Sequence, residues 1–527
     1  MQSRIWTRFL RILKGGVLFL AALALVLLGA RAYLSQSGLP LESWHTFVPD
    51  ELSADEIDAA DWDQYLKAED AIFESMRTRV SQTLGSEERV PYNRYFEDSP
   101  IYPAKLSEDW NHSYLRKPEG KPIGAVVLLH GLTDSPYSLR HIGRRYRELG
   151  FLTIGIRLPA HGTVPAALTA VEWEDWMAAT RLAVREAKRQ IDPGAPLHLV
   201  GFSNGGALAV KYALDAIEDE HLARPDRLVL ISPMIGVTRF ARMAGLAGLP
   251  ALLPAFAKAA WLGVVPEFNP FKYNSFPING AVQSYRLTDA LQRQIVRLSK
   301  AGRLASVAPM LTFQSVLDFT VSTPAIISGL YAHLPENGSE LVLFDVNRTV
   351  KFGPLMRPAT EAAIERLLPS LPQPYRITVI ANADNGVEDT VARIIAPGQT
   401  TVEVTPLGIP YPPQIFSLSH VAIPFPMDDS LYGLEPNPNE NFGVHLGVIA
   451  ARGERGALIV NLDSLFRIAS NPFYPYMIER IEEGIANPAP AVNEKLGGVP
   501  LQAAETQADV SAGADYLDPL PQPAEDP

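Results

Sequence analysis

The sequence predicts an α/β fold in which helices cover both faces of a mostly parallel sheet. Between residues 121 and 233, short continuous apolar runs alternate with longer amphipathic stretches, a pattern typical of buried parallel strands joined by helices. The alternation stops at Met234 and resumes at Pro309. Because the 72 residues of 234–305 are too many for a plain connection, they predict a helical cap inserted into the sheet domain.

The predicted strands and helices follow one another in a regular order. The strands are GAVVLLHG, FLTIGIRL, PLHLVGFS and DRLVLISP, because each is a short apolar run bounded by turn residues. The helices between them are SLRHIGRRYRELG, VEWEDWMAATRLAVREAKRQI and GGALAVKYALDAIED. Beyond the cap we expect strands in PMLTFQSVLD and ELVLFDVN and strand-like pieces in YRITVIANAD and TTVEVTPL. The strand-like GALIVNLD and a closing helix follow.

Shifts in composition divide the chain into segments. The cap region is rich in Ala, Leu and Pro, and the last residues are rich in Pro, Ala and acidic side chains, which predicts disorder there. The expected segments are an N-terminal membrane anchor or signal at 1–32, an extension at 33–120 with an amphipathic helix near 54–80, a core at 121–233 and 306–496 with a second insertion at 347–419, the helical cap at 234–305, and a disordered acidic tail at 497–527.

Composition excludes several classes of function. The net charge of −12 argues against nucleic-acid binding, which needs clustered Lys and Arg. The absence of cysteine excludes disulfides, a thiolate nucleophile and cysteine-based metal sites. No H-E-x-x-H motif is present, so we expect neither a metal nor a cofactor.

The N-terminus carries an export or anchoring signal. Four basic residues precede the apolar run GGVLFLAALALVLLGA, whose 16 residues lie between a signal-peptide core and a full membrane span. Ala30-Arg31-Ala32 is a poor cleavage site, which favours an uncleaved single-pass anchor in the inner (cytoplasmic) membrane with the body of the protein on the extracytoplasmic side. The alternatives are a secreted or periplasmic protein after signal cleavage, or a buried helix of a soluble protein. The basic residues are Arg4, Arg8, Arg11 and Lys14.

Ser203 is the candidate nucleophile. Gly201-Phe202-Ser203-Asn204-Gly205 matches the G-x-S-x-G nucleophile elbow, which places a serine on a sharp turn between a strand and a helix. The predicted strand before it and helix after it provide that context. The alternative is a helix-capping serine, but capping does not need glycine on both sides.

A nucleophilic serine needs a general base, and four histidines follow Ser203. His221 lies in a charged stretch, His333 lies near a helix end, and His445 lies in an apolar run. We favour His420, which lies in the loop-like IFSLSHVAIPF, with His445 as the next candidate.

The acid that orients this histidine should follow a strand beyond the cap. Asp318 ends the strand-like LTFQSVLD and is the preferred candidate. Asp345 ends the next strand, in LVLFDVN, and Asp384 lies in NADNG, whose residues are explained by turn formation alone.

Five stretches, taken together, resemble the α/β-hydrolases, and more narrowly the bacterial carboxylesterase and monoacylglycerol-lipase branch. They are VVLLHGLTDSPYSLR, IRLPAHG, LVGFSNGG, LTFQSVLDFTV and SLSHVAIPF, in family order. The resemblance implies a catalytic triad of Ser203, Asp318 and His420, with the backbone amides of Leu132 and Asn204 as the oxyanion hole. The chain departs from the family in one respect, because 73 residues (347–419) precede a histidine that usually follows the last strand closely.

These observations favour a serine hydrolase that cleaves carboxylic esters through an acyl-enzyme on Ser203. The apolar run ARMAGLAGLPALLPAFAKAAWLGVV and the anchor favour an acyl-chain or lipid-like ester, unless that run is simply the core of the cap. One alternative is an aminopeptidase-like enzyme that cleaves amides or peptides. Another is a non-catalytic, membrane-anchored binding protein on a hydrolase fold. The expected partners are a small ester or lipid substrate and, through the N-terminal helix, the membrane, with no nucleic acid.

Overall fold

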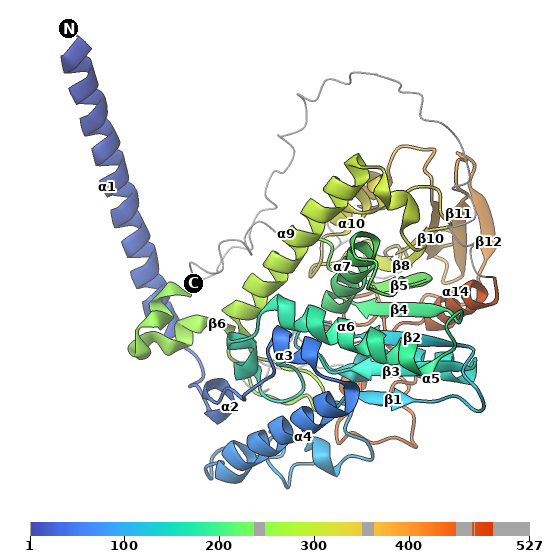
Figure 1. Cartoon of the computed structure of the whole chain (residues 1–527), viewed down its shortest axis with the longest axis horizontal. Helices are drawn as coiled ribbons and strands as arrows, with labels where there is room; N and C mark the ends of the chain where they lie inside the picture. Colours follow the sequence, from blue (N-terminus) through green and yellow to red (C-terminus); the bar gives the residue numbers. More distant parts are fainter. Residues whose placement is uncertain (1, 237–247, 350–362, 450–465, 468, 488–527) are drawn as a thin grey trace. The chain divides into compact units, whose positions relative to one another are not determined.

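A computed structural model describes residues 2–236, 248–349, 363–449, 466–467 and 469–487. Its centre is a ten-stranded sheet in the order β1-β3-β2-β4-β5-β8-β9-β10-β11-β12 (Figure 1). The strands are β1 (Tyr114–Arg116), β2 (Gly124–Leu129), β3 (Phe151–Ile156), β4 (Leu197–Phe202), β5 (Arg227–Ile231), β8 (Met310–Ser315), β9 (Glu340–Phe344), β10 (Arg376–Asn382), β11 (Thr390–Ile395) and β12 (Glu403–Pro406).

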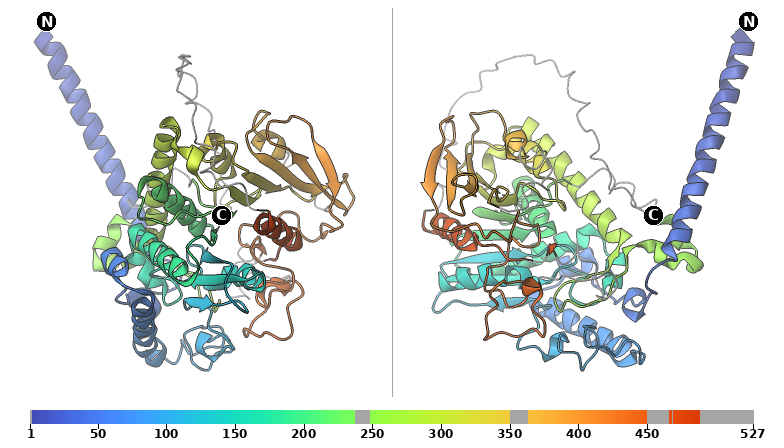
Figure 2. Two further views of the ribbon diagram at one scale, coloured as in Figure 1. Left: turned by 45° about the vertical axis from the view of Figure 1, so that its right-hand side comes forward. Right: turned by 180° about the vertical axis from the view of Figure 1, so that it is seen from behind.

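The seven strands from β3 to β10 in this order pair in parallel, whereas β1, β11 and β12 pair antiparallel at the two edges. The predicted parallel sheet is therefore confirmed. The strand-like pieces expected within 347–419 do not form a separate unit. Instead β10 continues the parallel pairing of β9, and β11 and β12 extend the same sheet, as the two views of Figure 2 show in orange.

Both faces of the sheet are covered by helices, because alternate side chains of each buried strand point to opposite faces. Val127 of β2 packs in one apolar cluster with Trp176 of α6, whereas its neighbour Val126 packs in a second cluster with Met477 of α14. Helices α6, α7 and α9 contribute to the first cluster, and α5 and α14 to the second. These helices are α5 (Arg140–Glu148), α6 (Trp173–Gln190), α7 (Asn204–Glu218), α9 (Ile278–Lys300) and α14 (Tyr474–Ala486).

The N-terminal extension is built onto the sheet domain. It contains α2 (Ser43–Thr46), α3 (Ala54–Ala59), α4 (Trp62–Arg79) and β1, which pairs with β3. Arg157, at the end of β3, forms ion pairs with Glu51 at 2.9 Å and Glu69 of α4 at 3.1 Å. Because Arg157 and Glu69 are almost completely buried, the extension shares the interior of the core.

The described part of the expected cap contains more than helices. Between the short 3-10 helices η5 (Leu249–Leu252) and η6 (Pro254–Ala260) and the long helix α9, strands β6 (Trp261–Gly263) and β7 (Phe276–Pro277) form an antiparallel hairpin. Strands this short leave no periodic pattern in a sequence, which is why none was expected. Helix α9 packs against α7 and so belongs to the helical layer on the sheet. The strand-like GALIVNLD falls outside the described residues.

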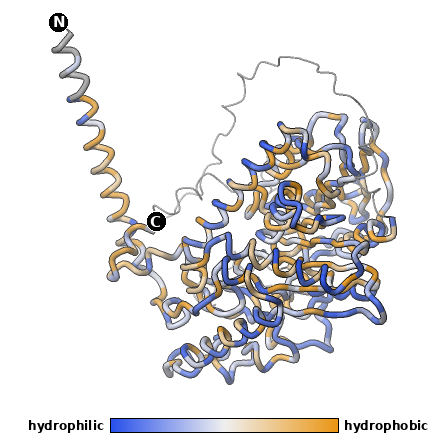
Figure 3. Tube along the Cα trace, in the orientation of Figure 1, coloured by the Kyte–Doolittle hydropathy of each residue, from blue (hydrophilic) through white to orange (hydrophobic). Residues whose placement is uncertain are grey.

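Helix α1 (Gln2–Ser35) precedes this domain and is apolar over most of its length (Figure 3). Within the described residues it is the one helix long and apolar enough to cross a membrane, and its candidate span is Arg11–Ser35. None of its apolar window is buried against the protein, unlike the core helix of a soluble domain. A membrane anchor and a signal sequence both fit this helix.

Candidate active site

Ser203 occupies the tight turn between β4 and α7. Its backbone has φ 53° and ψ −113°, a strained conformation for a residue other than glycine. The turn also requires glycine on either side: a Cβ added to Gly201 would lie 2.3 Å from the carbonyl oxygen of Gly205, and one added to Gly205 would lie 1.9 Å from that of Leu129. These contacts explain why the sequence places Ser203 between two glycines.

The strained turn is held by the neighbouring strand. The amide of Ser203 donates to the carbonyl of Ile231 at the end of β5 (3.0 Å), and the Ser203 carbonyl accepts from the amide of Met234 (2.9 Å). The serine therefore lies at the carboxyl edge of the parallel strands, where ligands bind in open α/β sheets.

Asp318 and His420 are brought together at the same edge. His420 Nδ1 lies 2.8 Å from Oδ2 of Asp318, which follows β8, and both side chains are buried. The other oxygen, Oδ1, accepts the amides of Thr320 at 2.7 Å and Val321 at 3.0 Å. Burial alone would raise the pKa of Asp318, but the charge of His420 and these hydrogen bonds lower it. The carboxylate therefore stays ionised and can hold the imidazole at Nδ1.

His420 also lies next to the elbow. Its ring centroid is 5.2 Å from that of Phe202, the residue before Ser203. With Nδ1 on the carboxylate, Nε2 is the nitrogen left for proton exchange. The segment is fixed at Ser419, whose hydroxyl donates to the carbonyl of Arg467 at 2.6 Å.

The other candidate bases and acids have different partners. His445 Nδ1 lies 2.8 Å from the Ser430 carbonyl, and His333 Nδ1 lies 3.3 Å from the Ser299 hydroxyl. Asp345 pairs with Arg348 at 3.1 Å, and Asp384 accepts the amide of Asn385 in an exposed turn. His221 is exposed in the loop after α7. None of these five residues is hydrogen-bonded to Asp318 or His420 within the described part of the chain.

The two predicted oxyanion donors lie near Ser203. Asn204 is the first residue of α7, so its amide has no acceptor within the helix. Leu132 follows Gly131, where an added Cβ would lie 3.3 Å from Cβ of Ser203. The loop that carries Leu132 thus passes directly beside the serine.

His130 holds this loop through both ring nitrogens. Its Nε2 accepts the amide of Leu158 (3.0 Å), so the neutral ring carries its proton at Nδ1 and donates it to the Gly131 carbonyl (2.9 Å). Burial and the neighbouring His161 lower the pKa of His130 well below its usual value, which keeps the ring neutral.

Several residues of this region were not anticipated from the sequence. The amide of Tyr273, in the β6–β7 hairpin, donates to the carbonyl of Thr133 at 2.7 Å and so supports the loop that carries Leu132. Asp134 is buried within electrostatic range of Lys272 and His420; burial raises the pKa of Asp134, and the two positive groups oppose that rise. No sequence signal connects segments so far apart in the chain.

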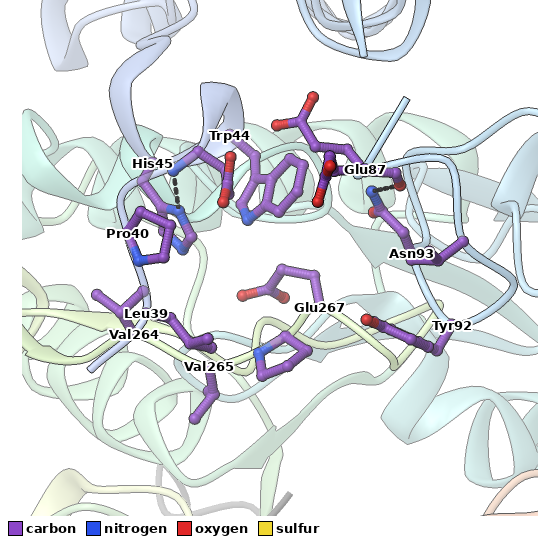
Figure 4. A pocket seen from close by; sticks show the side chains of 14 residues that line it. Leu39, Pro40, Trp44, His45, Glu87, Tyr92, Asn93, Val264, Val265 and Glu267 are labelled. Carbon is purple, nitrogen blue, oxygen red and sulfur yellow. Dashed lines mark hydrogen bonds between the residues drawn. The ribbon is translucent and has the colours of Figure 1, made fainter. Parts of the chain in front are cut away.

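A cavity of about 190 Å³ lies away from these residues (Figure 4). It is formed by the start of the N-terminal extension and the β6–β7 hairpin, and includes Leu39, Trp44, Glu42, Glu267 and Val265. Its lining contains none of the predicted catalytic or oxyanion residues. Within the described residues no group of three His, Asp or Glu side chains could hold a metal ion.

A family model and several known proteins match part of the chain. Residues 120–345 match the model of the family described as serine aminopeptidase, S33. This match covers β2 to β9, the parallel strands that carry the elbow and Asp318. The chain has the α/β-hydrolase fold.

Relatives of this α/β-hydrolase include lipases. A thermostable monoacylglycerol lipase of Bacillus sp. (strain H-257) is 26% identical over 206 residues, which are 38% of this chain and 73% of the lipase. Among solved structures, a metagenome-derived lipolytic enzyme is 22% identical with a TM-score of 0.34, covering 43% of this chain and 83% of its own. The monoacylglycerol lipase of Paleococcus ferrophilus is 20% identical with a TM-score of 0.31, and the match covers 42% of this chain and 84% of the lipase.

Proposed function

We propose that this α/β-hydrolase is a serine hydrolase that cleaves carboxylic esters through an acyl-enzyme on Ser203. The observation that carries the proposal is the 2.8 Å contact between His420 and Asp318, at the same sheet edge as the strained turn of Ser203. A buried carboxylate on Nδ1 fixes the histidine tautomer and stabilises the imidazolium that forms when Nε2 takes a proton.

In the proposed reaction, Ser203 Oγ attacks the ester carbonyl while His420 Nε2 accepts its proton. The negative charge on the carbonyl oxygen is stabilised by the backbone amides of Leu132 and Asn204. Collapse of this intermediate expels the alcohol, which takes the proton from His420 and leaves the acyl group on Ser203. Water then attacks the acyl-enzyme with His420 again as base, which releases the acid and restores the serine.

The substrate we propose is an acyl-chain or lipid-like ester, and the site of action is the extracytoplasmic side of the inner membrane. The resemblance to monoacylglycerol lipases and the apolar helix α1 support this proposal. Arg4, Arg8, Arg11 and Lys14 precede the apolar run that starts at Gly15, and this supports the orientation, because basic flanks remain cytoplasmic.

Labelling with a fluorophosphonate probe tests the proposal directly. The full-length protein in detergent is expected to be labelled, and Ser203→Ala is expected to abolish the label. Absence of label on folded wild-type protein would refute catalysis at Ser203 and favour a non-catalytic binding protein.

A peptide-cleaving enzyme is the second candidate, and the description of the matched family as serine aminopeptidase favours it. Rates on p-nitrophenyl esters of increasing chain length and on aminoacyl p-nitroanilides separate the two. We expect hydrolysis of octanoate or longer esters to exceed both acetate ester and anilide hydrolysis. A preference for acetate would contradict the lipid-like substrate, and a preference for the anilides would indicate peptide cleavage.

A further inference from the structure

The described end of the apolar cap run is exposed rather than buried in a core of its own. Leu252 is 80% exposed, Leu253 60% and Leu262 50%. Several large aliphatic side chains exposed within one short segment are a feature of surfaces that contact a partner or a membrane. The exposed group, here called the leucine rim, consists of Leu249, Leu252, Leu253 and Leu262.

The leucine rim is the outer side of a segment whose inner side is packed. Ala259 and Trp261 are buried, and the Trp261 ring makes an edge contact with His45 at 5.0 Å between centroids. The segment is therefore held in place on the domain while its leucines face outward. A loop that exposed these residues only through fraying would lack such buried anchors.

The same segment is attached to the end of α1. Arg31 donates from its guanidinium to the carbonyl of Trp261 at 2.6 Å, and Lys258 donates to the carbonyl of Ser37 at 2.7 Å. Helix α1 contacts both η5 and η6, and Figure 1 shows these elements side by side at the base of the helix. The leucine rim thus lies where the candidate membrane span ends.

Exposed apolar residues of α1 continue this surface. Tyr33 and Leu34, in the last turn of the helix, are exposed, as is Leu39 just beyond it. In Figure 3 the apolar colour runs from the helix into the segment at its base. Tyrosine is enriched where helices leave the bilayer, so this end of α1 has the composition of a membrane interface.

We infer that the leucine rim inserts into the interfacial layer of the same bilayer that α1 enters, and so seats the cap region on the membrane surface. Continuity with α1 identifies the occupant, because a span ending at Ser35 places the attached segment at headgroup depth. This inference rests on the membrane anchoring included in the proposed function.

Single-cysteine labelling tests the inference, since the natural chain has no cysteine. Leu252→Cys is labelled with an environment-sensitive fluorophore in the full-length protein and reconstituted into vesicles of phosphatidylethanolamine and phosphatidylglycerol. Val404→Cys on β12 is the matched control, because Val404 is 57% exposed and lies on the strand at the far edge of the sheet.

We expect the label at position 252 to shift to shorter wavelength and to be quenched at least about twofold by lipids that carry a shallow spin label. The label at position 404 should show neither effect. An unshifted label at position 252 would overturn the inference, and a shifted label without lipid quenching would do so in favour of contact with a second copy of the chain.

A kinetic comparison separates this inference from the proposed function. Replacement of Leu252, Leu253 and Leu262 by serine should lower hydrolysis of a long-chain ester embedded in vesicles, while hydrolysis of a soluble short-chain ester stays unchanged. Equal rates on the vesicle substrate would contradict seating by the leucine rim. Loss of the proposed function would instead appear as no hydrolysis of either substrate by the wild-type protein.

Discussion

His420 and Asp318 are 102 positions apart in the sequence, yet His420 Nδ1 lies 2.8 Å from the Asp318 carboxylate. The two residues come from distant parts of the chain: Asp318 follows β8, and His420 follows β12. Four strands, β9 to β12, lie between them in the chain, yet the two side chains meet in the folded protein. The contact gives the proposed mechanism its most specific test.

Asp318→Asn should reduce kcat for ester hydrolysis about 10³- to 10⁴-fold with KM changed less than about threefold. The backbone amides of Thr320 and Val321 hold the amide oxygen of the new side chain at the Oδ1 position, so its NH2 group faces His420 Nδ1 and donates to it. This hydrogen bond selects the wrong tautomer of His420, and a neutral amide cannot stabilise an imidazolium. Steady-state kinetics on a soluble p-nitrophenyl ester provide the measurement. Asp384→Asn, in an exposed turn, is the control and should retain wild-type kcat.

The identity of the base is tested by a pair of histidine variants. His420→Ala should abolish measurable turnover, because Ser203 then lacks a base. His445→Ala should retain most of it, since the ring of His445 is bonded to the backbone of Ser430. Both variants are compared for kcat and for circular dichroism. Turnover that survived in His420→Ala and failed in folded His445→Ala would reverse the assignment.

The sequence could predict the elbow and the sheet because their signals are local. Gly201 and Gly205 flank Ser203 within one turn, and the buried strands are continuous apolar runs whose pairing follows the alternation of strands and helices. Asp318 and His420 could be selected only as candidates, since nothing local distinguishes them from Asp345 or His445. Their meeting depends on the path of the intervening chain.

Other parts of the structure have no pattern in the amino-acid sequence that predicts them. The pairing of β10 with β9 makes Arg376–Asn382 part of the central sheet, which the expected second insertion at 347–419 did not anticipate. Tyr273 supports the loop of Leu132 through a backbone amide, which any residue except proline could supply. Exposure of the leucine rim could not be predicted either, because an apolar run has the same sequence whether it lies in a core or on a surface.

Because the turn around Ser203 is tightly packed, adding one methyl group at Gly205 should strongly lower the stability of the fold. Gly205→Ala would place Cβ 1.9 Å from the Leu129 carbonyl oxygen, and relieving that overlap requires backbone shifts that cost about 3 kcal/mol or more of unfolding free energy. Gly194→Ala is the control, since nothing lies within 4 Å of its added Cβ. Urea unfolding of both variants measures the difference. Equal stability of the two would contradict the close approach of α7 to β2.

Buried histidines predict a fall in stability under acid conditions. Burial lowers the pKa of His45 and His161 to about 4 and of His198 to about 3, from 6.5. As the pH falls below 6.5, these histidines become protonated in the unfolded chain but stay neutral in the folded chain. The free energy of unfolding therefore decreases with falling pH until the pH reaches the folded-state pKa values. The expected loss is on the order of 3 kcal/mol per histidine.

Urea unfolding at intervals between pH 7 and pH 4.5 measures this slope. His45→Gln should make it shallower, because glutamine can replace the hydrogen bonds of His45 but does not titrate. His221→Gln, at an exposed position, should leave the slope unchanged. A free energy of unfolding independent of pH over this window would contradict the buried neutral state of these rings.

The ion pairs that join the N-terminal extension to the core should differ greatly in how much each contributes to the free energy of unfolding. Arg157→Met removes the guanidinium that pairs with the buried Glu69 carboxylate and leaves that charge with His112 and Ser113 as its partners, so the variant should lose about 3–5 kcal/mol of unfolding free energy. Arg181 and Asp58 join the same two parts through a solvent-exposed pair, so Arg181→Ala should cost less than about 1 kcal/mol. Unfolding free energies in urea at neutral pH distinguish the two cases. Equal losses of unfolding free energy in the two variants would show that the extension is held at its surface rather than through the buried Arg157. Unfolding of the extension alone would appear in Arg157→Met as a second transition at lower urea concentration.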